Sequence, residues 1–79
     1  MSVNPDSPVA MYEQLANLLR EKIDAGEITG KLPSVTRLQQ EYGIGSQVTV
    51  LRAIELLVAE GVVYTVTRRG TYVSDSYKR

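Results

Sequence analysis

A cluster of hydrogen-bonding side chains at the start of one predicted helix is the first feature of this sequence that could do chemistry. The cluster comprises Ser46, Gln47, Thr49 and Arg52. A glutamine amide can pair with adenine, an arginine guanidinium binds guanine or phosphate, and small hydroxyl groups bind bases or phosphates. The positive end of the helix also attracts phosphate. The cluster therefore indicates contacts with duplex DNA, although the same side chains could simply form the solvent-exposed side of a core helix.

Two further groups carry similar side chains. Arg68-Arg69-Gly70 separates two strand-like segments, and paired guanidinium groups at a hairpin tip could reach a minor groove or flank phosphates. The alternative for this tip is an ordinary solvated turn. Ser34, Thr36 and Arg37 open another predicted helix, whose N-terminus and hydroxyl groups could hold a phosphate. The alternatives here are that Ser34 is only a helix cap and that Arg37 pairs with Glu41 four residues later.

Catalytic and metal chemistry lack the residues that they need. The 79-residue chain has no cysteine and no histidine, which removes disulfides, thiolate metal sites and the commonest general base. We find neither a nucleophile paired with a base nor a glycine loop that would cradle phosphates. We therefore expect no enzyme, no catalytic residue, no metal and no cofactor. A domain of this size also leaves little room for an effector pocket, so no small-molecule ligand is expected.

The net charge of zero argues against nucleic acid, because phosphate binding is usually accompanied by a basic excess. The distribution of the charges matters more. Acidic residues fall mainly in the first predicted helix and late in the others, whereas basic residues fall in the segments expected to face DNA. These basic residues are Lys31, Arg37, Arg52, Arg68 and Arg69. A neutral chain can therefore still be polarised.

The N-terminal segment includes Asp6 and no apolar run, so it does not resemble a signal peptide. No stretch approaches the roughly 20 apolar residues of a membrane span. These two observations predict no membrane association and a cytoplasmic protein.

The first helix is expected to begin at Ser7-Pro8, run to about Ala25 and stop at Gly26. The polar side of this helix, which includes Arg20, is expected to be solvated. The apolar positions recur with the spacing of one buried helical face and are Tyr12, Leu15, Ala16, Leu19 and Ile23.

Two more helices should follow a connector over residues 28–32, in which a short edge strand fits before Pro33. Ser34 is expected to cap a helix of about two turns that Gly43 ends. Ile44 should insert between the helices as a plug, and Ser46 should cap a third helix over about residues 47–60. The apolar residues that this third helix should bury are Val50, Ala53, Ile54, Leu57 and Val58.

A β-hairpin completes the pattern. Residues 62–66 and 71–73 are rich in β-branched and aromatic side chains and flank the basic tip. Helix, helix, tight turn, helix and hairpin is the order of a winged helix-turn-helix, an α+β fold of three helices with a C-terminal β-hairpin wing. We expect this DNA-binding domain over residues 8–73, between a flexible N-terminal segment (1–7) and a flexible C-terminal tail (74–79).

A series of different short motifs also follows in a distinctive order along residues 8–73. They are Met11-Tyr12-Glu13-Gln14-Leu15, Ile23-Asp24-Ala25-Gly26-Glu27, Lys31-Leu32-Pro33-Ser34, Glu41-Tyr42-Gly43-Ile44, Thr49-Val50, Arg52-Ala53-Ile54, Leu56-Leu57, Glu60-Gly61 and Arg69-Gly70-Thr71-Tyr72-Val73. In their order and spacing they resemble the N-terminal DNA-binding domain of the GntR family of bacterial transcription regulators. The resemblance implies a protein that binds inverted repeats as a dimer, with half-sites about 34 Å apart.

The chain departs from the family pattern in three places. Relatives usually carry an acidic and then a basic, DNA-contacting residue where this chain has Val35 and Thr36, so Arg37 is the available substitute. The turn before the third helix is one residue longer, and Ser46 or Gln47 must replace the usual arginine. Relatives also continue after the wing into an effector-binding and dimerising domain. This chain is therefore either a truncated form of a longer regulator or a free-standing small regulator of the kind that phages and mobile elements use.

Together these patterns predict a sequence-specific transcription regulator, a repressor that occludes a promoter, with double-stranded DNA as its partner and a homodimer as the form that binds DNA. Two other classes stay open: an architectural or recombination-accessory protein that bends DNA, and a winged helix that contacts only proteins. In the favoured interpretation each group of residues contacts a different part of the DNA. The major groove is read by Gln47, Thr49 and Arg52, the DNA backbone is touched by Ser34, Thr36 and Arg37, and the minor groove is contacted by Arg68, Arg69 and Gly70.

Overall fold

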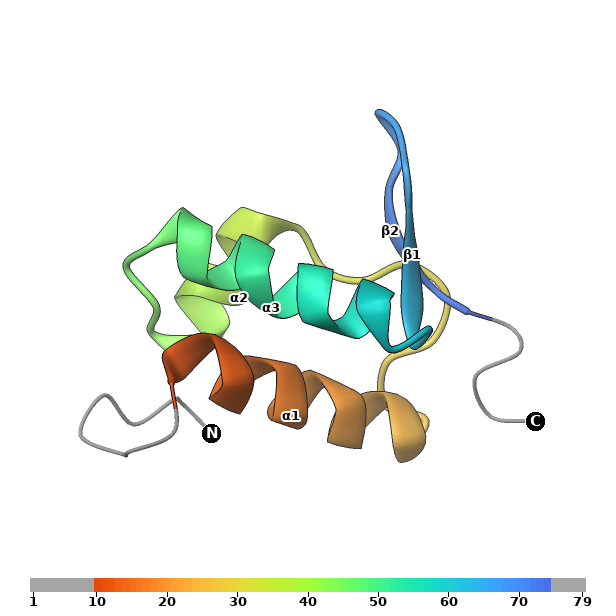
Figure 1. Cartoon of the computed structure of the whole chain (residues 1–79), viewed down its shortest axis with the longest axis horizontal. Helices are drawn as coiled ribbons and strands as arrows, with labels where there is room; N and C mark the ends of the chain where they lie inside the picture. Colours follow the sequence, from red (N-terminus) through yellow and green to blue (C-terminus); the bar gives the residue numbers. More distant parts are fainter. Residues whose placement is uncertain (1–9, 75–79) are drawn as a thin grey trace.

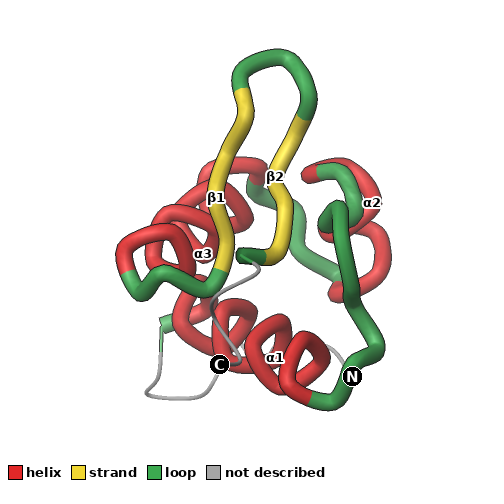
Figure 2. Tube along the Cα trace, turned by 90° about the vertical axis from the view of Figure 1, so that its right-hand side faces the viewer, coloured by secondary structure: helices red, strands yellow, loops and turns green. Residues whose placement is uncertain are grey.

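Three helices and a two-stranded antiparallel sheet make up the computed structural model, which describes residues 10–74. In Figure 1 the long helix α1 lies along one side of α3, and the hairpin rises beside the C-terminal end of α3. Figure 2 shows the same hairpin projecting beyond the helices, with α1 on the opposite side. The predicted winged helix-turn-helix is confirmed. The elements are α1 (Met11–Asp24), α2 (Val35–Tyr42), α3 (Gln47–Ala59), β1 (Val63–Val66) and β2 (Gly70–Val73).

One apolar cluster joins all these elements. Its buried members come from each helix, from the turn between α2 and α3, and from the start of the hairpin, and no polar or charged side chain of the described residues is buried with them. The apolar stripe predicted for the first helix forms its part of the core, with Tyr12 half-buried at its edge. The buried residues are Leu15, Ala16, Leu19, Ile23, Leu32, Leu38, Tyr42, Ile44, Val50, Ala53, Ile54, Leu57, Val62 and Val63.

The first helix is shorter at its start than the sequence pattern predicts. Helix α1 begins at Met11, after Ala10, whose backbone is not helical and whose side chain offers no cap. The predicted start at Pro8 is therefore wrong, and the predicted cap, Ser7, lies outside the described residues. The helix ends as expected, because Gly26 takes a positive φ of 79° just after the C-cap.

Local hydrogen bonds define α2 and the turn after it. The Ser34 Oγ accepts a hydrogen bond from the Arg37 N–H at 3.2 Å, which confirms Ser34 as the N-cap. Gly43 ends α2 in the left-handed conformation, at a φ of 67°. Ile44 then enters the core with 3% of its surface exposed, as the predicted plug. These contacts set the angle at which α3 leaves the turn.

Tyr42 is the largest buried side chain of α2. Burial raises the pKa of its hydroxyl, while the nearby Lys22 ammonium acts in the opposite direction. The neutral phenol is therefore the form that the folded protein favours.

Helix α3 buries fewer of its apolar residues than its composition suggests. Val50, Ala53, Ile54 and Leu57 are buried as predicted, but Val58 is 41% exposed, so its predicted place in the core is wrong. Val58 lies one position beyond Leu57, and a rotation of about 100° per residue carries it out of the contact with α1. Hydrophobicity alone does not reveal this rotation.

Strand β2 is hydrogen-bonded on both sides. Strands β1 and β2 pair in register from Val63 opposite Val73 to Val66 opposite Gly70. The predicted edge strand exists only as an isolated bridge, in which Lys31 lies opposite Tyr72. Two hydrogen bonds support it: the Leu32 N–H donates to the Thr71 carbonyl at 2.8 Å, and the Val73 N–H donates to the Gly30 carbonyl at 2.7 Å. The wing is therefore anchored to the segment that leads into α2.

The ends of the predicted domain stay predictions. The Ser74 N–H donates to the Val62 carbonyl at 3.0 Å, so the backbone pairing continues one residue past β2, into the first residue of the predicted tail. The rest of that tail, residues 75–79, and the predicted N-terminal segment over residues 1–7 lie outside the described residues.

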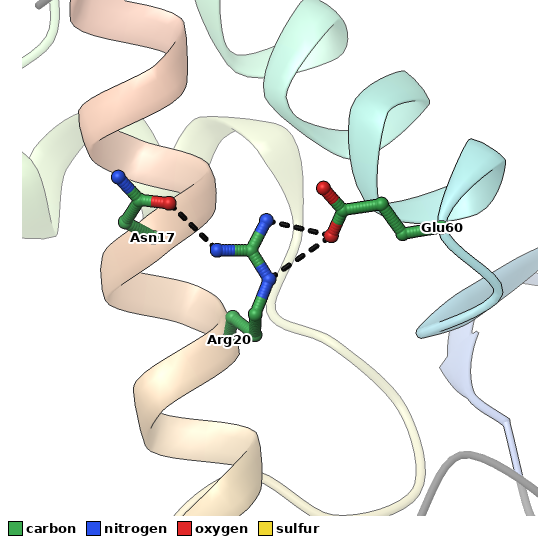
Figure 3. A network of polar contacts seen from close by, with 3 residues as sticks. All are labelled: Asn17, Arg20 and Glu60. Carbon is green, nitrogen blue, oxygen red and sulfur yellow. Dashed lines mark hydrogen bonds and ion pairs between the residues drawn. The ribbon is translucent and has the colours of Figure 1, made fainter.

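Arg20 is not simply solvated, as its position on the polar side of the first helix suggests. Its Nε and Nη2 atoms donate to the Glu60 Oε1 at 3.0 and 2.6 Å, and its Nη1 donates to the Asn17 Oδ1 at 2.6 Å (Figure 3). Glu60 is the C-cap residue of α3. The guanidinium therefore joins α1 to the end of α3 across 40 positions of sequence.

Candidate nucleic-acid interface

The N-cap and first two turns of α3 carry the cluster that the sequence singles out. Gln47 and Arg52 are exposed, and Thr49 is half-buried. The Ser46 Oγ accepts a hydrogen bond from the Thr49 N–H at 3.4 Å, so this serine caps the helix. The serine hydroxyl still has its own proton to donate, because the cap uses only an oxygen lone pair. An amide and a hydroxyl donor therefore lie at the positive end of α3, and the Arg52 guanidinium follows in the second turn.

The start of α2 carries the second predicted group. Thr36 and Arg37 are exposed, and Ser34 holds its capping position at the surface. The alternative pairing of Arg37 with Glu41 does not form: within residues 10–74 the ion pairs are Arg20 with Glu60 and Lys22 with Glu27. The Arg37 guanidinium is therefore available to a partner outside the chain.

The wing tip places the third group on a turn of unusual backbone geometry. The Arg69 N–H donates to the Val66 carbonyl at 3.0 Å, which closes the turn. Arg68 lies inside this turn at a φ of 65°, in the left-handed region that favours glycine, and Gly70 follows at 117°. An arginine in this region costs about 1–2 kcal/mol. Arg68 is exposed and adopts this conformation in spite of the cost, which favours a functional role for its guanidinium.

Aromatic side chains on one face of the hairpin support the tip. The rings of Tyr64 and Tyr72 are stacked with their centroids 5.8 Å apart, and the Tyr72 hydroxyl donates to the Arg69 carbonyl at 3.4 Å. The turn that carries the arginines is thereby tied to the strands below it. Nothing in the sequence motifs indicated this bond.

A surface hollow of about 350 Å³ shows that the wing and the start of α2 are neighbours. Its lining includes Ser34 from the start of α2, Ile54 from α3, and the stretch from Arg68 to Thr71 from the wing. Lys31 lies in the same lining, and its side chain passes so close to Gly70 that a Cβ built there would lie 2.7 Å from the Lys31 Cε. The structure therefore brings Lys31 into the candidate interface, where the sequence analysis noted its charge but assigned it no contact.

Gln39 is a positioning residue that sequence reasoning missed. Its backbone carbonyl accepts the Ile44 N–H at 2.9 Å, and its side-chain amide donates to the Ile44 carbonyl at 3.4 Å. Both bonds span the turn between α2 and α3. Gln39 therefore helps to fix α3 relative to α2, and a glutamine in the middle of an amphipathic helix gives no sign of this in the sequence.

The unpaired basic residues gather on a few elements, whereas exposed acidic residues lie on all three helices and include Glu41 of α2 and Glu55 of α3. The basic residues of α1, Arg20 and Lys22, are each ion-paired, to Glu60 and Glu27. In Figures 1 and 2, helix α1 lies on the side of the molecule away from the wing tip. The basic residues that are exposed and have no ion-pair partner within residues 10–74 all come from the candidate interface and are Lys31, Arg37, Arg52, Arg68 and Arg69.

Residues 11–73 match the sequence profile described as bacterial regulatory proteins, gntR family. The chain belongs to the GntR family. Among its relatives is the HTH-type transcriptional repressor NagR of Bacillus subtilis, which is 38% identical over 76 residues. That alignment covers 94% of this chain and 31% of NagR, so the chain spans less than a third of the length of this relative.

Two solved structures place this GntR-family chain among DNA-binding domains. YtrA from Sulfolobus acidocaldarius, a GntR-family transcription factor, is 32% identical with a TM-score of 0.81, over 94% of this chain and 79% of that one. The DNA-binding domain of AraR in complex with operator ORX1 is 30% identical with a TM-score of 0.78, over 94% of this chain and 96% of that one.

No helix within residues 10–74 is long and apolar enough to cross a membrane.

Proposed function

We propose that this GntR-family chain binds duplex DNA at specific sequences and acts as a transcription regulator, a repressor that occludes its promoter. The observation that carries the proposal is the placement of the unpaired cations: the exposed basic residues without an ion-pair partner in the described chain come from α2, α3, the wing and the connector beside the wing. A surface that leaves its cations unpaired is suited to phosphate. The operator complex of the related AraR domain supports the same partner.

Each element has a separate task in this proposal. The exposed Gln47 and Arg52 read base edges in the major groove, and Ser46 and Thr49 add hydroxyl contacts at the helix start. Ser34, Thr36 and Arg37 contact phosphates at the start of α2. These assignments make α3 the source of sequence preference and α2 a source of affinity.

The wing supplies the third part of the interface. Arg68 and Arg69 extend from the hairpin tip into the adjacent minor groove, where Gly70 allows the backbone to come close. Lys31, beside Gly70, adds a phosphate contact at the base of the wing. Two copies bound to an inverted repeat would place their half-sites about 34 Å apart, one helical turn of DNA. The chain itself performs no catalysis in this scheme.

Selection of random duplex DNA on the 79-residue chain, followed by sequencing and titration at two salt concentrations, tests the proposal. We expect an enriched inverted repeat and an affinity that falls steeply with salt. Tandem sites with strong DNA bending would instead indicate an architectural protein. An absence of enrichment together with salt-independent binding would refute DNA recognition by this surface.

Variants then separate base contacts from phosphate contacts. Gln47→Ala and Arg52→Ala should each relax the preference at a contacted base, at a cost of about 1–3 kcal/mol. Arg69→Ala should weaken binding to all sequences alike and reduce the salt slope by about 1. Lys22→Ala, which removes the same charge from α1, is the matched control and should leave both quantities unchanged. Parent-like specificity of both α3 variants would rule out α3 as the reading element.

A further inference from the structure

Two apolar side chains project from α3 without a role in the core. Val48 is 59% exposed and Leu51 is 42% exposed, and neither is among the hydrophobic side chains that pack against the core cluster. The two residues are three positions apart on a helix, so their side chains are neighbours. They form a small apolar patch in the first two turns of α3.

The patch lies beside the side chains proposed to read bases. Gln47 and Leu51 are four positions apart, as are Val48 and Arg52, so each apolar side chain is adjacent to one polar reader. The exposed Glu55, four positions after Leu51, borders the patch on its C-terminal side. A helix face that enters the major groove meets hydrogen-bonding edges and one kind of apolar group, the C5-methyl of thymine.

We propose that Val48 and Leu51 pack against thymine methyl groups in the major groove and thereby select A·T pairs within each half-site. This inference rests on the proposed function, because it requires α3 to lie in the groove. An A·T pair presents adenine N6 and N7 to an amide and a thymine methyl to a hydrocarbon. Gln47 and Leu51, four positions apart on α3, can therefore match the two halves of such a pair.

The size of the patch favours a methyl group over a protein partner. A stable protein interface buries about 800 Å² on each side. Two side chains that stand among Gln47 and Arg52 offer only a small part of that area. One methyl group, in contrast, needs only the contact of one side chain. Burial of a methyl-sized group corresponds to an affinity change of about fourfold.

Deoxyuridine provides the direct test, because it keeps the pairing of thymidine and lacks only the methyl group. In the operator selected on the parent chain, each thymidine is replaced singly by deoxyuridine and the dissociation constant is measured. We expect about a fourfold weakening at one or two positions in each half-site. Val48→Ala should weaken the thymidine operator by a similar factor and abolish the effect of deoxyuridine at its own position, and Leu51→Ala should do so at another position.

Val58→Ala is the matched control. Val58 is the same type of residue on the same helix, 41% exposed, but lies in the last turns of α3. It should retain the affinity of the parent and every deoxyuridine effect. Because Val48 is exposed, its alanine variant should fold, which thermal unfolding followed by circular dichroism checks. Val48→Thr, which keeps one methyl group and the side-chain shape, provides a second variant with an intermediate effect.

The possible failures are distinguishable. A selected operator that tolerates deoxyuridine at every thymidine overturns this inference, as does a Val48→Ala variant that keeps the deoxyuridine effects of the parent. In either case, salt-dependent binding to the operator leaves the proposed function intact. A parent chain that binds no duplex DNA overturns both.

Discussion

Replacement of Gly70 by alanine tests the geometry that holds the wing. A Cβ at this position faces two separate obstacles: a φ of 117°, which L-amino acids rarely adopt, and the Lys31 Cε at 2.7 Å. The backbone obstacle costs about 1–3 kcal/mol. The steric obstacle is cheaper, because the far end of a lysine side chain can move to another rotamer. Alanine also lowers the conformational entropy of the unfolded chain, which stabilises the folded state by about 0.4–1 kcal/mol.

The net expectation for Gly70→Ala is a loss of about 1–2 kcal/mol in the free energy of unfolding. For a domain of this size that loss lowers the melting temperature by roughly 5–15 °C. Urea titration followed by far-UV circular dichroism measures it, provided that the urea dependence of the free energy is unchanged. Gly45→Ala is the matched control, since Gly45 has no positive φ and a Cβ there would meet nothing within 4 Å. It should be neutral or slightly stabilising.

The double variant Gly70→Ala with Lys31→Ala decides which obstacle dominates. If the backbone term is the larger, removal of the lysine side chain restores little, and the double variant stays as unstable as the single one. Recovery to the stability of Lys31→Ala alone would refute the strain argument and assign the cost to steric contact. A Gly70→Ala chain as stable as the parent would refute both terms.

Three further perturbations follow from the packing and the electrostatics. Ile44→Ala removes the buried plug between α2 and α3 and should cost about 2–4 kcal/mol in urea titration; a loss below about 1 kcal/mol would show that the turn does not depend on the plug. Glu60→Gln removes the charge that Arg20 binds at a partly exposed site, so it should cost about 0.5–1 kcal/mol at low salt, and a cost that persists in 1 M salt would contradict an ionic origin. Because burial raises the pKa of Tyr42 in the folded state, its contribution to stability is complete below about pH 10, the unfolded value, and is lost as the pH rises through the folded pKa. Melting curves of Tyr42→Phe should lack this alkaline component, and an identical alkaline decline in the variant would assign it to other groups.

Most of the local structure could be predicted because its causes are local. The caps at Ser34 and Ser46 are bonds to the backbone three residues later, and the stop at Gly43 needs only the left-handed φ that glycine adopts freely. The order of these signals was enough to predict the winged helix-turn-helix, and to propose its DNA-facing segments, without any contact information. The predicted interface residues are all at the surface or half-buried, but their roles in DNA binding stay predictions until binding is measured.

The wrong predictions concern features that depend on contacts between elements. The start of the first helix was placed too early because a serine and a proline are permitted at a helix start but do not require one. Val58 was assigned to the core because its hydrophobicity was considered without the angle at which α3 lies on α1. The predicted edge strand shrank to a single bridge, since pairing depends on how much of β2 the connector can reach.

The order of the helices and strands and the positions of the side chains that could bind DNA follow from short stretches of sequence, because periodicity, capping and turn preferences act over a few residues. Packing between distant segments places Lys31 against Gly70 at the base of the wing, pairs Arg20 with Glu60, and leaves Val48 and Leu51 outside the core. Each of these depends on contacts or orientations between segments far apart in the chain. Such relations are set by how the helices and the hairpin pack around one apolar cluster, and no short window of sequence contains them.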